Sequence, residues 1–102
     1  MLTGCVASQS LYYWGDYSDT SYQYQKTPTA ETMAAHIATL EKIIERSLDE
    51  GRRVAPGLAY ELAMLEIERG SPSRGRQLLL LELTNYPESS VMVNRALSQL
   101  EE

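Results

Sequence analysis

The sequence predicts an all-α protein of about four helices, preceded by an extended and aromatic-rich N-terminal segment. From residue 27 onward, apolar residues recur at steps of three and four, which is the period of an amphipathic helix. Glycine and proline fall between these patterned stretches, where they end one helix and begin the next. With 102 residues, 43% of them hydrophobic, the chain has room for one compact domain plus a tail.

The overall charge argues against a nucleic-acid partner. Nine basic residues stand against fourteen acidic ones, for a net charge of −5. Because affinity for nucleic acid depends largely on neutralising phosphates, an acidic chain of this kind offers little attraction. We therefore expect no nucleic acid among the partners.

The first helix is predicted from Thr27 as N-cap, with Pro28 in the first turn, to about Glu50, where Gly51 ends it. Its apolar stripe consists of Met33, Ile37, Leu40, Ile44 and Leu48. His36 lies one step from this stripe and is interpreted as a residue at the edge of the buried face. With a single histidine in the chain, we expect no metal site and no cofactor.

Three further helices are predicted. One begins at Pro56 and Gly57 and runs to Gly70, and because it is apolar on more than one face we expect it to be covered on two sides. The next extends from about Arg74 to Tyr86, where Pro87 stops it. Ser89 or Ser90 caps the last helix. Its buried side is predicted to carry Val93, Ala96, Leu97 and Leu100.

The N-terminus resembles the bacterial lipobox, in which an aliphatic and two small residues precede a cysteine that becomes lipidated. Leu2, Thr3, Gly4 and Cys5 match this order. On this interpretation residues 1–4 are the remnant of a signal peptide, and acyl chains on Cys5 hold the protein at a membrane. No run approaches the roughly 20 apolar residues of a spanning helix. The alternative is a free thiol in a disordered leader.

The residue after the cysteine bears on location. Val6 stands where an inner-membrane retention signal often has Asp. We therefore expect the protein on the periplasmic side of the outer membrane, anchored by lipid. In this scheme residues 5–26 are the lipidated cysteine and a tether, and residues 27–102 are the helical domain.

The tether is unusually rich in aromatic side chains, among them Tyr12, Tyr13 and Trp14. Aromatic residues are enriched where one end is buried and the other forms hydrogen bonds, so part of the segment should dock. It would dock either on the protein's own helices or on a partner, with residues 11–13 as a candidate strand edge. Gly15 and Asp16 predict a bend after Trp14.

The stretch from Pro56 to Ser89 resembles one tetratricopeptide repeat, a helical hairpin of 34 residues. The positions that correspond to the repeat pattern are Ala59, Leu62, Ala63, Glu66, Gly75, Leu79 and Pro87, with Gly70 at the turn. Ala59 and Glu66 replace the expected aromatic residues. The resemblance implies that Tyr60, Met64 and Ile67 line the inner, ligand-binding face. Alternatively, these three contact the helix that begins at Thr27.

Four segments resemble the family called domain of unknown function 4810, and they span nearly the whole chain. They are LYYWG at 11–15, LEKIIE at 40–45, APGL at 55–58 and NYPES at 85–89. This resemblance implies a proteobacterial lipoprotein, of a family often encoded beside a lipoprotein similar to the curli secretion channel. It implies no activity, and it suggests an accessory subunit of an envelope complex.

We do not expect an enzyme. One histidine and one cysteine, the latter acylated on our interpretation, cannot assemble the usual nucleophile, base or metal site. The glycine-containing run 70–76 lacks the Gly-Lys-Ser/Thr ending of a phosphate loop.

Two functions remain. One is an assembly subunit that docks other envelope proteins, such as the channel-like lipoprotein, and the other is an independent periplasmic binder of peptides or peptidoglycan. The predicted partner-binding residues are Tyr12, Tyr13, Trp14, Tyr60, Met64 and Ile67.

Overall fold

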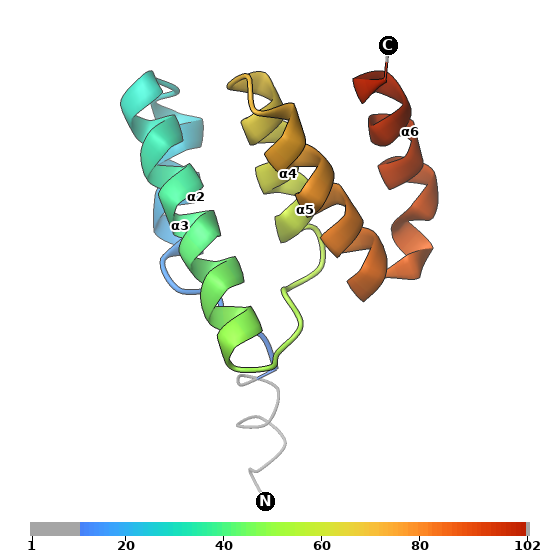
Figure 1. Ribbon diagram of the computed structural model, residues 1–102. Helices are drawn as coiled ribbons and strands as arrows, with labels where there is room; N and C mark the ends of the chain where they lie inside the picture. The colour runs from blue at the N-terminus through green and yellow to red at the C-terminus, as the bar shows by residue number, and fades with distance from the viewer. Residues whose placement is uncertain (1–10, 102) are drawn as a thin grey trace, which may run out of the picture. The chain divides into compact units, whose positions relative to one another are not determined.

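The computed structural model describes residues 11–101, and these are helical, without a strand (Figure 1). The predicted all-α class is therefore confirmed. The predicted lipidation site, Cys5, and the residues before it lie outside the described residues. The described chain divides into two compact units, residues 11–55 and residues 56–101.

The first unit is a hairpin of α2 (Tyr17–Lys26) and α3 (Ala30–Asp49). The prediction of an extended segment through Lys26 is wrong, because residues 17–26 form α2. This helix has no fully buried residue, and the face it turns to α3 carries tyrosine and threonine rather than aliphatic side chains. Packing against α3, and not helix propensity, stabilises it. The hydrophobic period of the sequence therefore could not reveal it.

The N-terminal cap of α3 lies two residues later than predicted. Thr29, not Thr27, is the N-cap, and its Oγ1 accepts a hydrogen bond from the Thr32 amide at 3.1 Å. The Thr29 amide donates to Thr32 Oγ1 at 2.9 Å, which completes a reciprocal capping box. A threonine fills the position where such boxes usually carry Glu or Gln. The cap was missed for this reason.

The C-terminal end of α3 is where the sequence predicts it. After the last helical residue, Asp49, the Gly51 amide donates to the Leu48 carbonyl and the Arg52 amide to the Ser47 carbonyl. These two bonds form a Schellman motif and satisfy carbonyl groups that the helix itself leaves free.

The buried stripe of α3 differs from the predicted one at its C-terminal end. Ile37, Leu40 and Ile44 are buried as expected, but Leu48 is 54% exposed. Ile43 and Ser47 are buried instead, because the helix also buries the face that continues from His36. The expected stripe was therefore too narrow.

The second unit contains α4 (Leu58–Glu68), α5 (Pro72–Asn85), a 3-10 turn η1 (Pro87–Ser89) and α6 (Ser90–Leu100). α4 and α5 form the predicted hairpin, and α6 packs against α5. Both helix boundaries at Gly70 and Pro87 agree with the sequence prediction within two residues. The buried apolar residues of this unit are Leu58, Ala59, Leu62, Ala63, Leu65, Leu78, Leu79, Tyr86, Val93 and Ala96.

The entry to α6 differs in detail from the prediction. Ser89 occupies the N-cap position, but it makes no capping hydrogen bond. Its hydroxyl instead donates to the Tyr86 carbonyl at 2.7 Å and supports the turn of η1. The serine therefore stabilises the turn between α5 and α6 rather than the start of α6.

α4 and α5 approach each other closely at Gly75, which is buried within α5. A Cβ atom at this position would meet Cγ1 of Ile67, lie 2.8 Å from its Cδ1 and lie 3.3 Å from the Ala63 carbonyl oxygen. Only a residue without a side chain fits such a contact without displacing the neighbouring helix. Gly75 and Ala63 are both small-residue positions of the repeat pattern, so the close crossing agrees with the predicted tetratricopeptide-like hairpin.

The close crossing predicts that Gly75→Val lowers the free energy of unfolding by about 1–3 kcal/mol, because the added methyl groups overpack the interface. Urea denaturation of the purified chain measures this. Gln77→Val, at an exposed position of the same helix, is the matched control and should change stability by less than about 0.5 kcal/mol. Equal unfolding midpoints for the two variants would show that the helices do not approach closely at Gly75.

Candidate protein-interaction surfaces

An open groove lies in the second unit between α4 and a partly exposed face of α6. The groove encloses a cavity of about 420 Å³. α4 contributes Tyr60, and η1 and α6 contribute Glu88, Ser89, Val91, Met92, Arg95, Ala96 and Gln99. Both α4 and α6 pack on α5, so α5 sets the distance between the two helices that border the groove.

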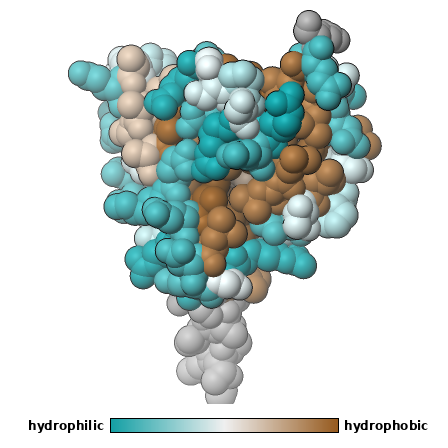
Figure 2. Space-filling view, viewed as in Figure 1, coloured by the Kyte–Doolittle hydropathy of each residue, from teal (hydrophilic) through white to brown (hydrophobic). Residues whose placement is uncertain are grey.

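α6 presents apolar side chains on two adjoining faces, which meet at Ala96. Val93 and Ala96 are buried, as predicted. Val91 and Met92, which the sequence analysis did not single out, are 73% and 40% exposed and line the groove. Figure 2 shows hydrophobic residues gathered over α5 and toward α6, in the right half of the view, in agreement with the exposure of Leu80 on α5. Val91 and Met92, adjacent in sequence and both exposed in the groove, form a candidate interaction surface.

The groove also carries two opposite charges. Glu88 and Arg95 both line it, and both are exposed. Neither side chain forms a hydrogen bond or an ion pair with any residue between 11 and 101. The groove thus combines an apolar centre with two charges that no side chain within residues 11–101 pairs with.

The start of α4, which holds Tyr60 in the groove, is capped by a buried side chain of α5. The N-cap residue, Gly57, has a φ of +92° and no side chain that could accept a hydrogen bond. The Gly57 amide donates to Glu82 Oε2 at 3.0 Å, and the Tyr60 amide donates to Glu82 Oε1 at 3.3 Å. Glu82 is only 3% exposed, and both oxygens of its carboxyl group accept hydrogen bonds from the start of α4. No local motif in the sequence indicated this contact.

The three residues predicted to share one binding face of α4 do not share one environment. Tyr60 lines the groove, as the resemblance implied. Ile67 packs against Gly75 of α5, and Met64 is half-buried and does not line the groove. Partner binding by these residues stays a prediction, with Tyr60 as the one placed in an open cavity.

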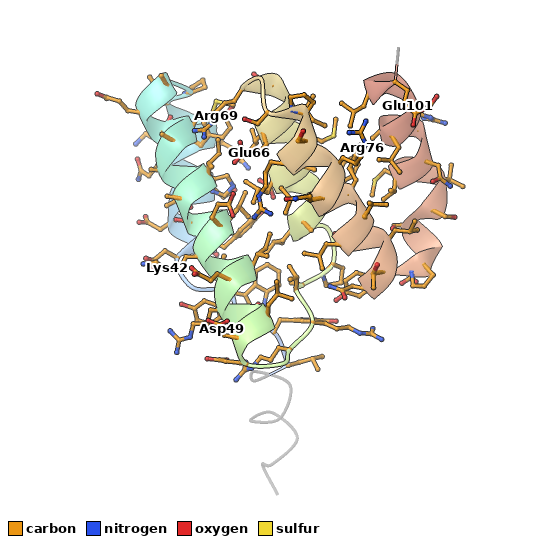
Figure 3. The ribbon with its side chains drawn as sticks, viewed as in Figure 1. Lys42, Asp49, Glu66, Arg69, Arg76 and Glu101 are labelled. Atoms are coloured by element: carbon orange, nitrogen blue, oxygen red, sulfur yellow. The ribbon has the colours of Figure 1, made fainter. Side chains whose placement is uncertain are left out.

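Glu66 occupies a position where the tetratricopeptide pattern expects an aromatic residue. Its side chain is 6% exposed, and Arg69 Nε lies 3.7 Å from Glu66 Oε1 near the C-terminal end of α4 (Figure 3). The arginine thereby compensates a buried acidic group, at a distance too long for a hydrogen bond. At this position the chain therefore has a buried acidic residue in place of the expected aromatic one, and Arg69, three residues later, compensates its charge.

The aromatic segment that precedes α2 docks on the first unit. The guanidinium carbon of Arg46 lies 4.7 Å from the centre of the Tyr13 ring, a cation–π contact with α3. The Tyr17 amide donates to the Trp14 carbonyl at 3.0 Å and closes the bend predicted at Gly15 and Asp16. Residues 11–13 form no strand. Of the two predicted docking surfaces, the protein's own helices or a partner, Tyr13 therefore uses the first, because it packs on α3.

Arg46 is itself held in place by Glu50. Arg46 Nε donates to Glu50 Oε2 at 2.9 Å, and this hydrogen bond lowers the pKa of the Glu50 carboxyl below its ordinary value. The same bond, together with the nearby Tyr13, raises the pKa of Arg46. The arginine accordingly remains charged over Tyr13 at any physiological pH.

His36 is the centre of an aromatic cluster, and its interpretation as an edge residue is wrong. The side chain is 1% exposed, because α2 covers it. Its Nδ1 lies 2.8 Å from Thr20 Oγ1 in a hydrogen bond. The rings of Tyr17 and Tyr24 lie 5.3 Å and 6.2 Å from the imidazole. The error follows directly from the missed helix α2.

Trp14 and Tyr12 are less completely docked than Tyr13. Trp14 packs edge-on against Tyr17, with 5.6 Å between the ring centres, yet it stays 45% exposed. Tyr12 is half-buried. The sequence prediction that these residues contact a partner is compatible with this exposure and stays a prediction.

Comparison with known proteins identifies the family. The model of a family described as a domain of unknown function, DUF4810, matches residues 11–96. The chain belongs to this family. No curated protein and no solved structure matches it. The matched range runs from the aromatic segment to α6, so both units of this DUF4810 chain are part of the family domain.

The described part of the DUF4810 chain contains no group of three or more His, Cys, Asp or Glu side chains arranged to hold a metal ion. None of its helices combines the length and the apolar character needed to span a bilayer. The features that its geometry does supply are the groove between α4 and α6 and the partly exposed aromatic residues before α2.

Proposed function

We propose that this DUF4810 chain is a lipid-anchored interaction subunit of a bacterial envelope complex. Acyl chains on Cys5 hold it on the periplasmic side of the outer membrane, and the groove between α4 and α6 binds a neighbouring envelope protein. A lipoprotein similar to the curli secretion channel is the leading candidate for this partner. No catalytic step is part of the proposal.

The observation that carries the proposal is the groove itself. Val91, Met92 and Tyr60 offer an apolar surface, and Glu88 and Arg95 flank it with charges. Such a surface suits recognition of another protein, since aromatic, Met and Arg side chains are enriched at the centres of interfaces. The lipobox-like order of residues 2–5 supports the anchor.

The anchor predicts where the protein partitions in cells. When the natural gene, including any preceding signal sequence, is expressed, the wild-type protein should be recovered with the outer membrane and carry the added mass of acyl chains. Cys5→Ser should move it to the soluble periplasmic fraction, because the thiol that accepts the lipid is gone. Fractionation and mass spectrometry measure both. Wild-type protein that is unmodified and freely soluble would contradict the anchor.

The groove predicts which residues capture the partner. Affinity purification of the lipidated wild-type protein from solubilised membranes should recover a stoichiometric envelope protein. A Tyr60→Ala/Met92→Ala double variant should reduce this recovery at least tenfold, since it removes the two apolar walls. Tyr22→Ala/Leu48→Ala, two exposed apolar positions of the first unit, is the matched control and should capture like wild type.

Undiminished capture by the groove variant would contradict the assignment of the groove. Co-sedimentation with purified peptidoglycan, without any stoichiometric protein, would instead support the alternative function of an independent cell-wall or peptide binder.

A further inference from the structure

The groove face of α6 has an internal symmetry that a single copy of the chain does not use. Val91 and Met92 form an exposed apolar pair near the N-terminal end of the helix. Glu88, in the adjoining 3-10 turn η1, lies three residues before the first of them, and Arg95, in α6, lies three residues after the second. All four side chains line the same groove. An apolar centre is therefore flanked, at equal spacing, by one negative and one positive charge.

This spacing is self-complementary when two such helices lie antiparallel. About a two-fold axis between positions 91 and 92, Val91 of one copy faces Met92 of the other. Glu88 of each copy then faces Arg95 of the other, because both lie 3.5 residues from the axis. This is about 5 Å along α6 for Arg95 and slightly more for Glu88, which lies in the 3-10 turn η1, where the rise is about 2 Å per residue. A two-fold interface requires this reciprocity, in which residue i meets j and j meets i. A parallel arrangement would place like charges together.

We infer that the groove face of α6 binds a second copy of this chain, in an antiparallel α6–α6 pair. The inference deepens the proposed function, since it names one partner for the same groove. It accounts together for the exposure of Val91 and Met92 and for the two charges without a partner in residues 11–101. Each copy supplies the charge that the other lacks.

The size of the contact sets the expected strength of the pair. Two turns of α6 and the neighbouring Tyr60 form a contact well below the standard size of a stable protein interface. Exposed ion pairs add little each, so the apolar pair supplies most of the affinity and the charges supply the orientation. We expect a dissociation constant in the micromolar range or weaker. Tethering both copies to one membrane would raise their effective concentration.

Sedimentation equilibrium of the purified full chain tests the inference, with Cys5→Ser to prevent an intermolecular disulfide. At low ionic strength, wild-type α6 should give a reversible, concentration-dependent dimer. Glu88→Arg alone should weaken dimerisation at least tenfold, since it sets Arg against Arg, and Arg95→Glu alone should do the same by setting Glu against Glu.

Mixing the two variants is the decisive step. In an equimolar mixture, Arg at position 88 of one copy faces Glu at position 95 of the other, and the native Arg95 faces the native Glu88. Both contacts are attractive, so two chains that separately stay monomeric should form a heterodimer with wild-type affinity. Glu68→Arg and Arg76→Glu, charge changes on exposed positions of α4 and α5, are the matched controls and should dimerise like wild type. Circular dichroism checks that every variant is folded.

Wild-type protein that stays monomeric up to millimolar concentration would overturn the inference, and so would single variants that dimerise normally or a mixture that stays monomeric. The assay contains no other protein, so its outcome is independent of capture from membranes. A monomeric chain that still captures an envelope protein in an Arg95-dependent way would assign the groove to that protein alone. Dimerisation without capture would leave the dimer standing and remove the proposed function.

Discussion

The hydrogen bonds from the start of α4 to the buried carboxyl group of Glu82 are the constraint on which the second unit depends. Gly57 turns the chain into α4 with a backbone conformation that favours glycine, and it therefore cannot cap the helix with its own side chain. Glu82 supplies the cap from α5. Without it, two part-buried amides at the start of α4 would lose their acceptors, at a cost of about 1 kcal/mol each. Tyr60 would then lose its fixed place in the groove.

The sequence predicted α3, α4 and α5 because interactions between residues close in sequence determine where these helices end. The apolar period and the glycines at 51 and 70 located α3, α4 and α5 within about two residues, because the caps that end these helices lie next to them in sequence. α2 escaped prediction because its contacts are tertiary. Tyr17, Thr20 and Tyr24 contact His36, which lies 12 to 19 residues further along the chain on α3. A polar sequence of tyrosine, serine and threonine has no apolar stripe to reveal that match.

The candidate site was predictable only in part, and for a similar reason. The repeat pattern indicated Tyr60, and the structure places it in the groove. It did not indicate Val91 and Met92. These two side chains are exposed because α6 packs on the rest of the unit through Val93 and Ala96. The sequence did offer one indication of this surface, because Val91 and Met92 are adjacent apolar residues that lie outside the predicted buried side of the last helix. The capping role of Glu82 could be recognised only in the three-dimensional structure. This residue lies 25 residues after Gly57 in the sequence, and no local capping rule reaches from one helix to another.

Amide hydrogen exchange at Gly57 and Tyr60, followed by nuclear magnetic resonance, reports whether the carboxyl group of Glu82 holds the start of α4. If Glu82 caps α4, both amides should exchange as slowly as those in the middle of the helix, such as Leu65, although neither has an acceptor within α4. Exchange at the rate of an exposed, unbonded amide would contradict the account, because it would mean that the start of α4, and with it the wall of the groove, is not held by α5.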